Sequence, residues 1–279
     1  MQDLAPGLYV VATPLGNARD ITLRALDVLR ACRRIYCEDT RITARLCARH
    51  GITTKRAAYH EHNAARKRPQ ILRELADGAS LALVSDAGTP LISDPGLPLI
   101  RAVRAAGHAI FSVPGPSAPI AALSIAGLPT SHFHFAGFLP PKSAARRAAI
   151  AALPRNAGTL VLFEAPHRLA ALLGDINDLW GDAPTAVGRE LTKRFEELRD
   201  GTAAELAAHF TATPPRGECV VLVSPPPEKT EAPDIDEQLA AALKTQSLRD
   251  AVAQVKAATG APHRQVYARA LALRAQSDA

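Results

Sequence analysis

The sequence lacks long apolar runs. No stretch approaches the roughly 18 consecutive apolar residues that a membrane-spanning helix needs. The first residues, MQDLAPGLYVVAT, have neither the basic segment nor the cleavage pattern of a secretory signal peptide. The sequence therefore predicts a chain with no membrane partner and a cytoplasmic location.

Cysteine is also scarce. The chain has four cysteines among 279 residues, and no two of them form a CxxC pair. Disulfide scaffolds and structural zinc sites use denser or regularly paired cysteines. We expect Cys32, Cys37, Cys47 and Cys219 to be reduced thiols.

Several catalytic fingerprints are missing. No GxGxxG follows a predicted strand and no GxxxxGK[ST] occurs, which excludes the common dinucleotide and P-loop sites. HExxH and GxSxG are absent too. On a strand His60 and His62 would share a face, but no third or fourth ligand accompanies them, so no metal is predicted.

Short apolar segments alternate with helical segments in the first part of the chain. This alternation predicts parallel strands joined by helices, an α/β domain. The expected strands are 8–13, 34–39, 80–86 and 109–115, and the expected helices are 21–32, 40–51, 97–107 and 118–128.

The pattern changes after residue 117, where strands outnumber helices. One predicted strand, RFEELRDG, directly follows another, TAVGREL, which indicates antiparallel pairing and a mixed sheet. Three helices end the chain, with Ser247 predicted as a cap and Gly260 in a turn that suggests a helix-turn-helix. The predicted division is 1–117 and 118–224 for two α/β domains, 225–233 for a linker, and 234–279 for a helical domain.

Positive charge is concentrated in one segment. Residues 24–73 hold 13 Lys and Arg against four acids, within a chain whose net charge is +6. Such an excess favours a polyanionic partner, although a solvated surface would have the same composition. The candidate contacts with the phosphates of such a partner are Arg41, Arg66, Lys67, Arg68, Lys142, Arg146, Arg147 and Arg168. Among these, Arg41 and Arg168 are the expected phosphate clamps, because guanidinium binds phosphate in a bidentate manner.

Three loops of small residues follow predicted strands: Thr13–Asn17, Asp86–Pro90 and Pro114–Ala118. In an open parallel sheet, ligands bind beyond the carboxyl ends of the strands. Glycine and alanine let a ligand approach the backbone, and Thr89 and Ser117 add hydroxyl groups. These loops predict a ligand site, although each could also be an ordinary turn.

Seven motifs occur in the order of a known family: TPLGNxxDIT, CEDTR, HEHN, VSDAGTPLISDPG, PGPSA, GFLPPK and RELTKRFEEL. Together they make the chain resemble the small-subunit ribosomal RNA methyltransferase I family, nearly from end to end. The resemblance implies methyl transfer from S-adenosylmethionine to the ribose 2′-oxygen of a cytidine in the decoding region. It also implies a tetrapyrrole-methylase-type fold, two α/β domains with the cofactor in the cleft between them, and a homodimer.

The same resemblance implies a cofactor site. Its expected residues are Pro14, Ala87, Gly88, Thr89, Ile92, Ser117, Ala118, Glu164 and Ala186. Tetrapyrrole-modifying relatives typically carry GDP where this chain has Gly88-Thr89-Pro90. The threonine argues against a corrin or sirohaem acceptor.

A ribose hydroxyl needs a general base or an environment that stabilises the alkoxide. We favour Glu38 or His60, because each would leave the end of a first-domain strand near the cofactor loops. Asp39, Glu61, His62, Glu164, His167, Arg189 and Lys193 stay open as alternatives. Two other functions also stay open: a tetrapyrrole methyltransferase, and a non-catalytic RNA-binding factor in ribosome assembly.

Overall fold

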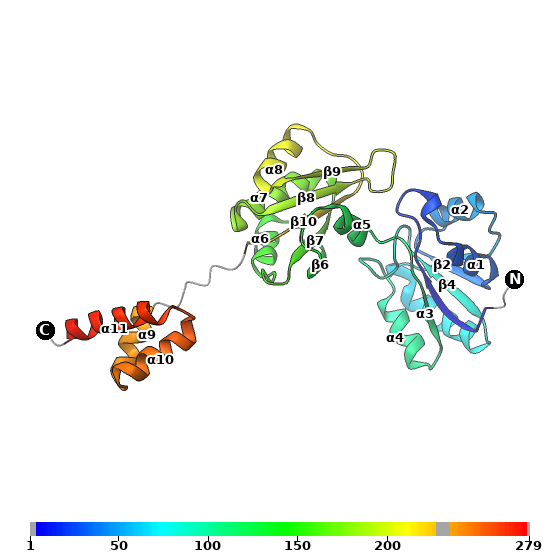
Figure 1. The fold of residues 1–279 in the computed structure, drawn as a ribbon. Coiled ribbons are helices and arrows are strands. Elements are labelled where there is room, and N and C mark those ends of the chain that lie inside the picture. The colour runs from blue at the N-terminus through cyan, green and yellow to red at the C-terminus, as the bar shows by residue number, and fades with distance from the viewer. Residues whose placement is uncertain (1–3, 227–234, 278–279) are drawn as a thin grey trace. The chain divides into compact units, whose positions relative to one another are not determined.

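The chain forms two compact units in a computed structural model that describes residues 4–226 and 235–277. The units are Met1–Pro226 and Pro227–Ala279. Most of the predicted linker, 225–233, lies outside the described residues. The first unit contains two sheets and the second contains only helices (Figure 1).

The first sheet is entirely parallel, as predicted. Its strand order is β3-β2-β4-β1-β5, and each neighbouring pair is parallel. The strands are β1 (Gly7–Val11), β2 (Arg34–Cys37), β3 (Arg56–Ala58), β4 (Ser80–Val84) and β5 (Ile110–Val113).

Helices cover both faces of this sheet. The helices are α1 (Leu23–Ala31), α2 (Thr40–Arg49), α3 (Glu61–Ala76) and α4 (Leu97–Ala105), with a short 3-10 turn η1 (Ala18–Asp20) before α1. Buried residues of α1 and α2 share one apolar cluster, and those of α3 and α4 share another. Helices α2 and α3 therefore lie on opposite faces of the sheet.

The HEHN segment, whose two histidines would share a face on a strand, lies instead at the start of helix α3. His60 is its N-cap residue, and Glu61 and His62 lie in its first turn. The backbone N–H of His60 donates to Oδ1 of Asn63 at 3.0 Å. This hydrogen bond satisfies a backbone N–H that would otherwise lack a partner at the start of the helix. The segment thus begins a helix, and its polar residues have a capping role.

The second sheet is mixed, as predicted. Its order is β6-β7-β10-β8-β9, with β6 and β7 parallel and the other pairs antiparallel. Its strands are β6 (Phe133–Phe138), β7 (Thr159–Glu164), β8 (Pro184–Arg189), β9 (Glu197–Thr202) and β10 (Cys219–Val223). The predicted antiparallel pairing of the two adjacent segments corresponds to β8 and β9.

Four helices cover the second sheet. They are α5 (Ala118–Ile125), α6 (Ser143–Ala151), α7 (Leu169–Trp180) and α8 (Ala203–Ala212), and a 3-10 turn η2 (Pro166–Arg168) precedes α7. Helices α6, α7 and α8 bury one face in a common core, whereas α5 packs against the other.

The second unit consists of α9 (Ile235–Leu243), α10 (Leu248–Thr259) and α11 (His263–Ser277). Ser247 caps α10 by accepting the N–H of Asp250, and Gly260 ends it in the left-handed conformation. Both features agree with the sequence. The three helices share their own small core around Leu239, Val252 and Val266.

All four cysteines are free and buried, in agreement with the sequence. Burial raises the pKa of the Cys32 thiol to about 12 and that of Cys219 to about 11. These thiols are therefore poor nucleophiles. Within residues 4–226 and 235–277, no helix is long and apolar enough to cross a membrane.

Candidate active site

The three predicted loops meet and are joined by hydrogen bonds. Thr13 and Gly88 form a two-way backbone bridge: the Thr13 N–H donates to the Gly88 carbonyl at 2.8 Å, and the Gly88 N–H donates to the Thr13 carbonyl at 3.0 Å. The Thr89 hydroxyl donates to the Pro116 carbonyl at 3.0 Å. The loops after β1, β4 and β5 therefore form one connected floor.

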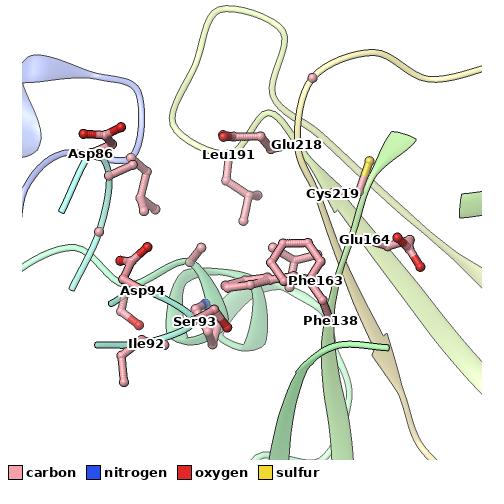
Figure 2. A pocket seen from close by; sticks show the side chains of 18 of the residues that line it. Asp86, Ile92, Ser93, Asp94, Phe138, Phe163, Glu164, Leu191, Glu218 and Cys219 are labelled. Atoms are coloured by element: carbon pink, nitrogen blue, oxygen red, sulfur yellow. The ribbon is translucent and has the colours of Figure 1, made fainter. Parts of the chain in front are cut away.

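A cavity of about 440 Å³ lies over this floor. Both α/β domains contribute to it. The first supplies polar groups, including Asp86, Ser93 and Asp94, and the second supplies apolar side chains, including Phe138, Phe163 and Leu191 (Figure 2). An apolar cavity with a few convergent polar groups is the usual form of a small-molecule site.

Seven of the nine predicted cofactor residues line this cavity: Ala87, Gly88, Thr89, Ile92, Ser117, Ala118 and Glu164. Pro14 instead lines a neighbouring cavity. Ala186 lines neither of these two cavities, because it is fully buried on β8 in a cluster with Val161 and Val220. Most residues that the resemblance implies for the cofactor site therefore line one cavity, whereas Ala186 is buried in the core of the second domain.

Glu164 lines the cavity without presenting its carboxylate to it. Side chains alternate along β7, so Phe163 faces the cavity while the Glu164 carboxylate lies on the other side of the strand (Figure 2). There Oε1 accepts the Ala165 N–H at 2.8 Å and lies 3.1 Å from Nε of Arg168. Glu164 therefore cannot activate an acceptor within this cavity.

Acidic side chains gather on the first-domain side of the cavity. Burial raises the pKa of Asp94 to about 6, and the negative charge of Glu38 contributes. Burial likewise raises the pKa of Asp86, although its Oδ1 accepts the Asp39 N–H at 3.0 Å. Burial also raises the pKa of Glu38, with a further contribution from Asp86. A raised pKa makes a carboxylate a better proton acceptor, and the value of about 6 for Asp94 is suited to proton transfer near neutral pH.

The predicted bases Glu38 and His60 line neither cavity. Glu38 directly follows β2, and His60 caps α3 beside the edge strand β3. Asp94 and Phe138 do line the cavity, but sequence reasoning did not select them. Asp94 lies in the SDPG segment, and the proline and glycine of that segment were the available signal of an unusual loop. Nothing in the neighbouring sequence distinguishes Phe138.

The loop containing Asp94 adopts an uncommon backbone conformation. Leu91 and Ser93 have φ angles of 74° and 66°. Glu190 and Thr192, in a loop of the second domain, have φ angles of 51° and 67°. Residues other than glycine are rarely found in this region, and such conformations concentrate at functional sites. The first of these loops borders the first cavity through Ser93, and the second loop borders the first cavity through Leu191 and the neighbouring cavity through Lys193.

Three predicted phosphate ligands are instead engaged within the protein. Arg146 is 4% exposed and binds Asp175 through Nε at 2.7 Å. Arg147 binds the same carboxylate at 3.2 Å. Arg168 donates to the Leu139 carbonyl at 2.8 Å in addition to pairing with Glu164. The sequence around Arg146 and Arg147 lacks acids, but α7 supplies Asp175, whereas Arg168 pairs with Glu164 four residues before it.

The remaining predicted RNA contacts are spread over separate surfaces. Arg66, Lys67 and Arg68 belong to α3, whereas Arg41 begins α2 on the opposite face of the sheet. Arg41 pairs with Asp39 at 2.6 Å but is 88% exposed. Lys142 is exposed at the start of α6. The basic segment 24–73 is therefore not a single basic face.

No group of three or more His, Cys, Asp or Glu side chains that could hold a metal ion occurs in the part of the chain that the structure describes. His60 and His62 lie near each other, with ring centroids 6.0 Å apart. No third side chain of a metal-binding type joins them among those residues.

Known proteins share both units of this chain. Residues 7–207 match the family described as Tetrapyrrole (Corrin/Porphyrin) Methylases, and residues 229–274 match the RsmI C-terminal HTH domain. Ribosomal RNA small subunit methyltransferase I of Mesorhizobium japonicum is 46% identical over 274 residues, covering 97% of this chain and 93% of its own. The protein of that name from Erythrobacter litoralis is 44% identical, covering 98% and 97%.

A solved structure resembles the fold. Uroporphyrin-III C-methyl transferase from Thermus thermophilus, complexed with S-adenyl homocysteine, has a TM-score of 0.53 and 18% identity, and the match covers 77% of this chain and 96% of that one. At such low identity, the likeness concerns the fold. The two domain matches and the similarity to these relatives over nearly the whole chain agree with the joined strand-end loops. The chain belongs to the tetrapyrrole methylases and, among them, to the ribosomal RNA small subunit methyltransferase I family.

Proposed function

We propose that this protein uses S-adenosylmethionine to methylate small-subunit ribosomal RNA, at the ribose 2′-oxygen of a cytidine in the decoding region. The observation that carries the proposal is the cavity over the joined loops, in a chain 46% identical to a protein named for this substrate. The acceptor is either free ribosomal RNA or the assembled small subunit.

The cavity suits a cofactor that combines an apolar ring system with polar ends. Its volume of about 440 Å³ lies within the range of roughly 300–1,000 Å³ for small-molecule sites. Gly88 has a φ of 76°, and an added Cβ would lie 3.2 Å from Leu15, so the bare backbone keeps this wall open. Phe138 and Phe163 offer apolar surface on the opposite side.

When bound, S-adenosylmethionine supplies an electrophilic methyl group. The protein must align an acceptor oxygen with that group, because in-line displacement depends strongly on orientation. The connected floor of loops provides rigidity: backbone bonds hold Thr13 to Gly88, and the Thr89 hydroxyl holds Pro116. Residues fixed by such contacts keep their position without further ordering when ligands bind.

A tetrapyrrole acceptor is the main alternative. The position where tetrapyrrole-modifying relatives typically carry aspartate is Thr89, whose hydroxyl is engaged with Pro116. It therefore offers no negative charge to a substrate. The helical second unit, which matches a domain named for the ribosomal RNA enzyme, also favours RNA.

Methyl transfer to unmodified small ribosomal subunits tests the proposal. With labelled S-adenosylmethionine, we expect label on one cytidine, and on its ribose, because a 2′-O-methyl group protects the adjacent phosphodiester from alkali. Label on a base would contradict the proposed atom, and label on a tetrapyrrole alone would support the alternative. A protein that bound subunits but not S-adenosylmethionine would instead be a non-catalytic assembly factor.

RNA binding should also weaken steeply with salt, because each neutralised phosphate releases counterions. Tetrapyrrole binding would respond much less. The cytoplasmic location predicted from the sequence is part of this proposal. The resemblance further implies a homodimer, which sedimentation of the purified protein tests directly.

A further inference from the structure

A second cavity, of about 460 Å³, adjoins the first. It lies beyond β1 and β4 and is bordered by helix α2 and the loop at Lys193. Four residues line both cavities: Leu15, Asp86, Ala87 and Glu218. The two spaces therefore meet at a short shared boundary, as the donor and acceptor sites of a group-transfer enzyme must.

The walls of the second cavity have two different chemistries. Leu15, Ile42 and Leu46 form an aliphatic surface. At the rim, Arg45 and Arg49 are exposed on α2, one helical turn apart. A ligand that fits both has an apolar, planar part and anionic groups on its outer side, which describes a nucleotide within an RNA strand.

The two arginines are available for an incoming anion. The side chains of Arg45 and Arg49 make no ion pair or hydrogen bond within residues 4–226 and 235–277. The third cation of the cavity, Lys193, is engaged by Glu190 and Glu218, each at 2.8 Å. Arg41 precedes Arg45 by one turn and extends the same stripe, although it pairs with Asp39.

Asp86 is the carboxylate best placed at the shared boundary. Glu218 also lines both cavities, but its carboxylate is 75% exposed and binds Lys193. Asp86 is partly buried, and the Asp39 N–H fixes one of its oxygens at 3.0 Å. The other oxygen is left to accept a proton.

We propose that the second cavity receives the acceptor nucleotide, with Arg45 and Arg49 binding the phosphates beside it and Asp86 accepting the proton of its ribose hydroxyl. This inference rests on the proposed function and specifies its RNA site. In the transfer, the ribose oxygen forms the bond to the methyl carbon. The methyl–sulfur bond breaks with its electron pair remaining on sulfur, and the hydroxyl proton passes to the Asp86 carboxylate.

The phosphate contacts are tested with the full-length variant Arg45→Ala/Arg49→Ala and unmodified small subunits. We expect about a tenfold or greater loss of subunit affinity and a salt dependence reduced by about two counterions, since each lost phosphate contact removes about one. Affinity for S-adenosylmethionine should be unchanged. The matched control is Arg101→Ala/Arg104→Ala, which removes the same charge from exposed positions of α4 on the opposite face of the sheet.

The proton acceptor is tested with Asp86→Asn, whose side-chain oxygen can still accept the Asp39 N–H. Single-turnover methylation should fall about 100-fold or more, the usual contribution of a general base, with both binding affinities retained. Glu38→Gln and His60→Ala serve as comparisons that line neither cavity.

Three outcomes would overturn the inference without touching the proposed function. They are equal subunit affinity in the α2 and α4 double variants, an unchanged single-turnover rate in Asp86→Asn, and a larger loss of rate in Glu38→Gln than in Asp86→Asn. Failure of the unaltered protein to methylate the subunits would instead refute the proposed function itself.

Discussion

At the scale of single residues, the open space of the cavity depends on position 88, where glycine has no side chain. Gly88 has a φ of 76°, and a Cβ there would approach Leu15 to 3.2 Å. We predict that Gly88→Val lowers the affinity for S-adenosylmethionine more than about tenfold, or about 1.4 kcal/mol, by narrowing the cavity. Isothermal titration calorimetry measures this effect.

The matched control is Gly107→Val. Gly107 has nearly the same φ, 75°, but an added Cβ meets nothing within 4 Å. In both variants, a valine in the left-handed conformation therefore lowers the stability by roughly 1–2 kcal/mol. Only Gly88→Val should lose affinity, and equal losses in the two variants would assign the effect to backbone strain.

Asp94 links the site to pH-dependent stability. Its pKa rises from 3.8 to about 6 in the folded state, because of burial and the charge of Glu38. The folded state therefore favours protonated Asp94, and ionisation costs stability progressively as pH rises from about 4 to above 6.

We predict that Asp94→Asn stabilises the cofactor-free protein at pH 8. The gain should be about 1 kcal/mol, because solvent screens a partly exposed carboxylate, or about 2–4 °C in Tm. It should vanish near pH 4, where the aspartate is protonated whether the chain is folded or unfolded. Thermal unfolding across this range tests the sign, and a gain independent of pH would indicate a packing effect.

At the scale of elements, a buried ion pair joins α6 to α7. Arg146 reaches Asp175 at 2.7 Å, and Ser143 and Arg147 contact the same carboxylate. Removing one member of a buried pair leaves an uncompensated charge. We predict that Arg146→Met destabilises the protein by about 3 kcal/mol in urea unfolding, the lower end of the usual range, because Arg147 remains.

Two further variants define this effect. Arg104→Met, at an exposed position of α4, should change stability by less than about 0.5 kcal/mol. The double variant Arg146→Met/Asp175→Leu should recover most of the loss, since both charges are removed. A double variant as unstable as Arg146→Met would mean that packing of the arginine stem, and not its charge, joins the helices.

At the scale of the whole molecule, the two units have separate cores. The core of the second unit is built from α9, α10, α11 and the turn at Ala261, and no residue that lines either cavity belongs to it. All residues that line the proposed cofactor cavity therefore belong to the first unit. We predict that deleting residues 230–279 leaves the affinity for S-adenosylmethionine within about twofold and weakens binding to small subunits.

Calorimetry and subunit binding on the same truncated protein measure both quantities. The Arg45→Ala/Arg49→Ala variant is the useful comparison, because it alters RNA contacts within the first unit. Equal subunit affinity with and without residues 230–279 would contradict a recognition role for the helical unit.

The sequence by itself determined the elements and the loops. Apolar spacing and turn residues are local properties, so they correctly predicted a parallel first sheet, a mixed second sheet and three final helices. Because parallel strands end at one edge, the small-residue loops were expected to meet, and Thr13, Gly88 and Pro116 are joined there. The ordered motifs also determined the family.

Only the tertiary structure decided which side chains face the cavity and which charges are free. The place of β7 in the sheet decides that Phe163, and not the Glu164 carboxylate, faces the cavity, and α7 supplies the acid that neutralises Arg146. The sheet separates the basic residues of α2 from those of α3. These outcomes depend on partners distant in sequence. Pairing and burial bring those partners together, whereas composition and periodicity describe only neighbours along the chain.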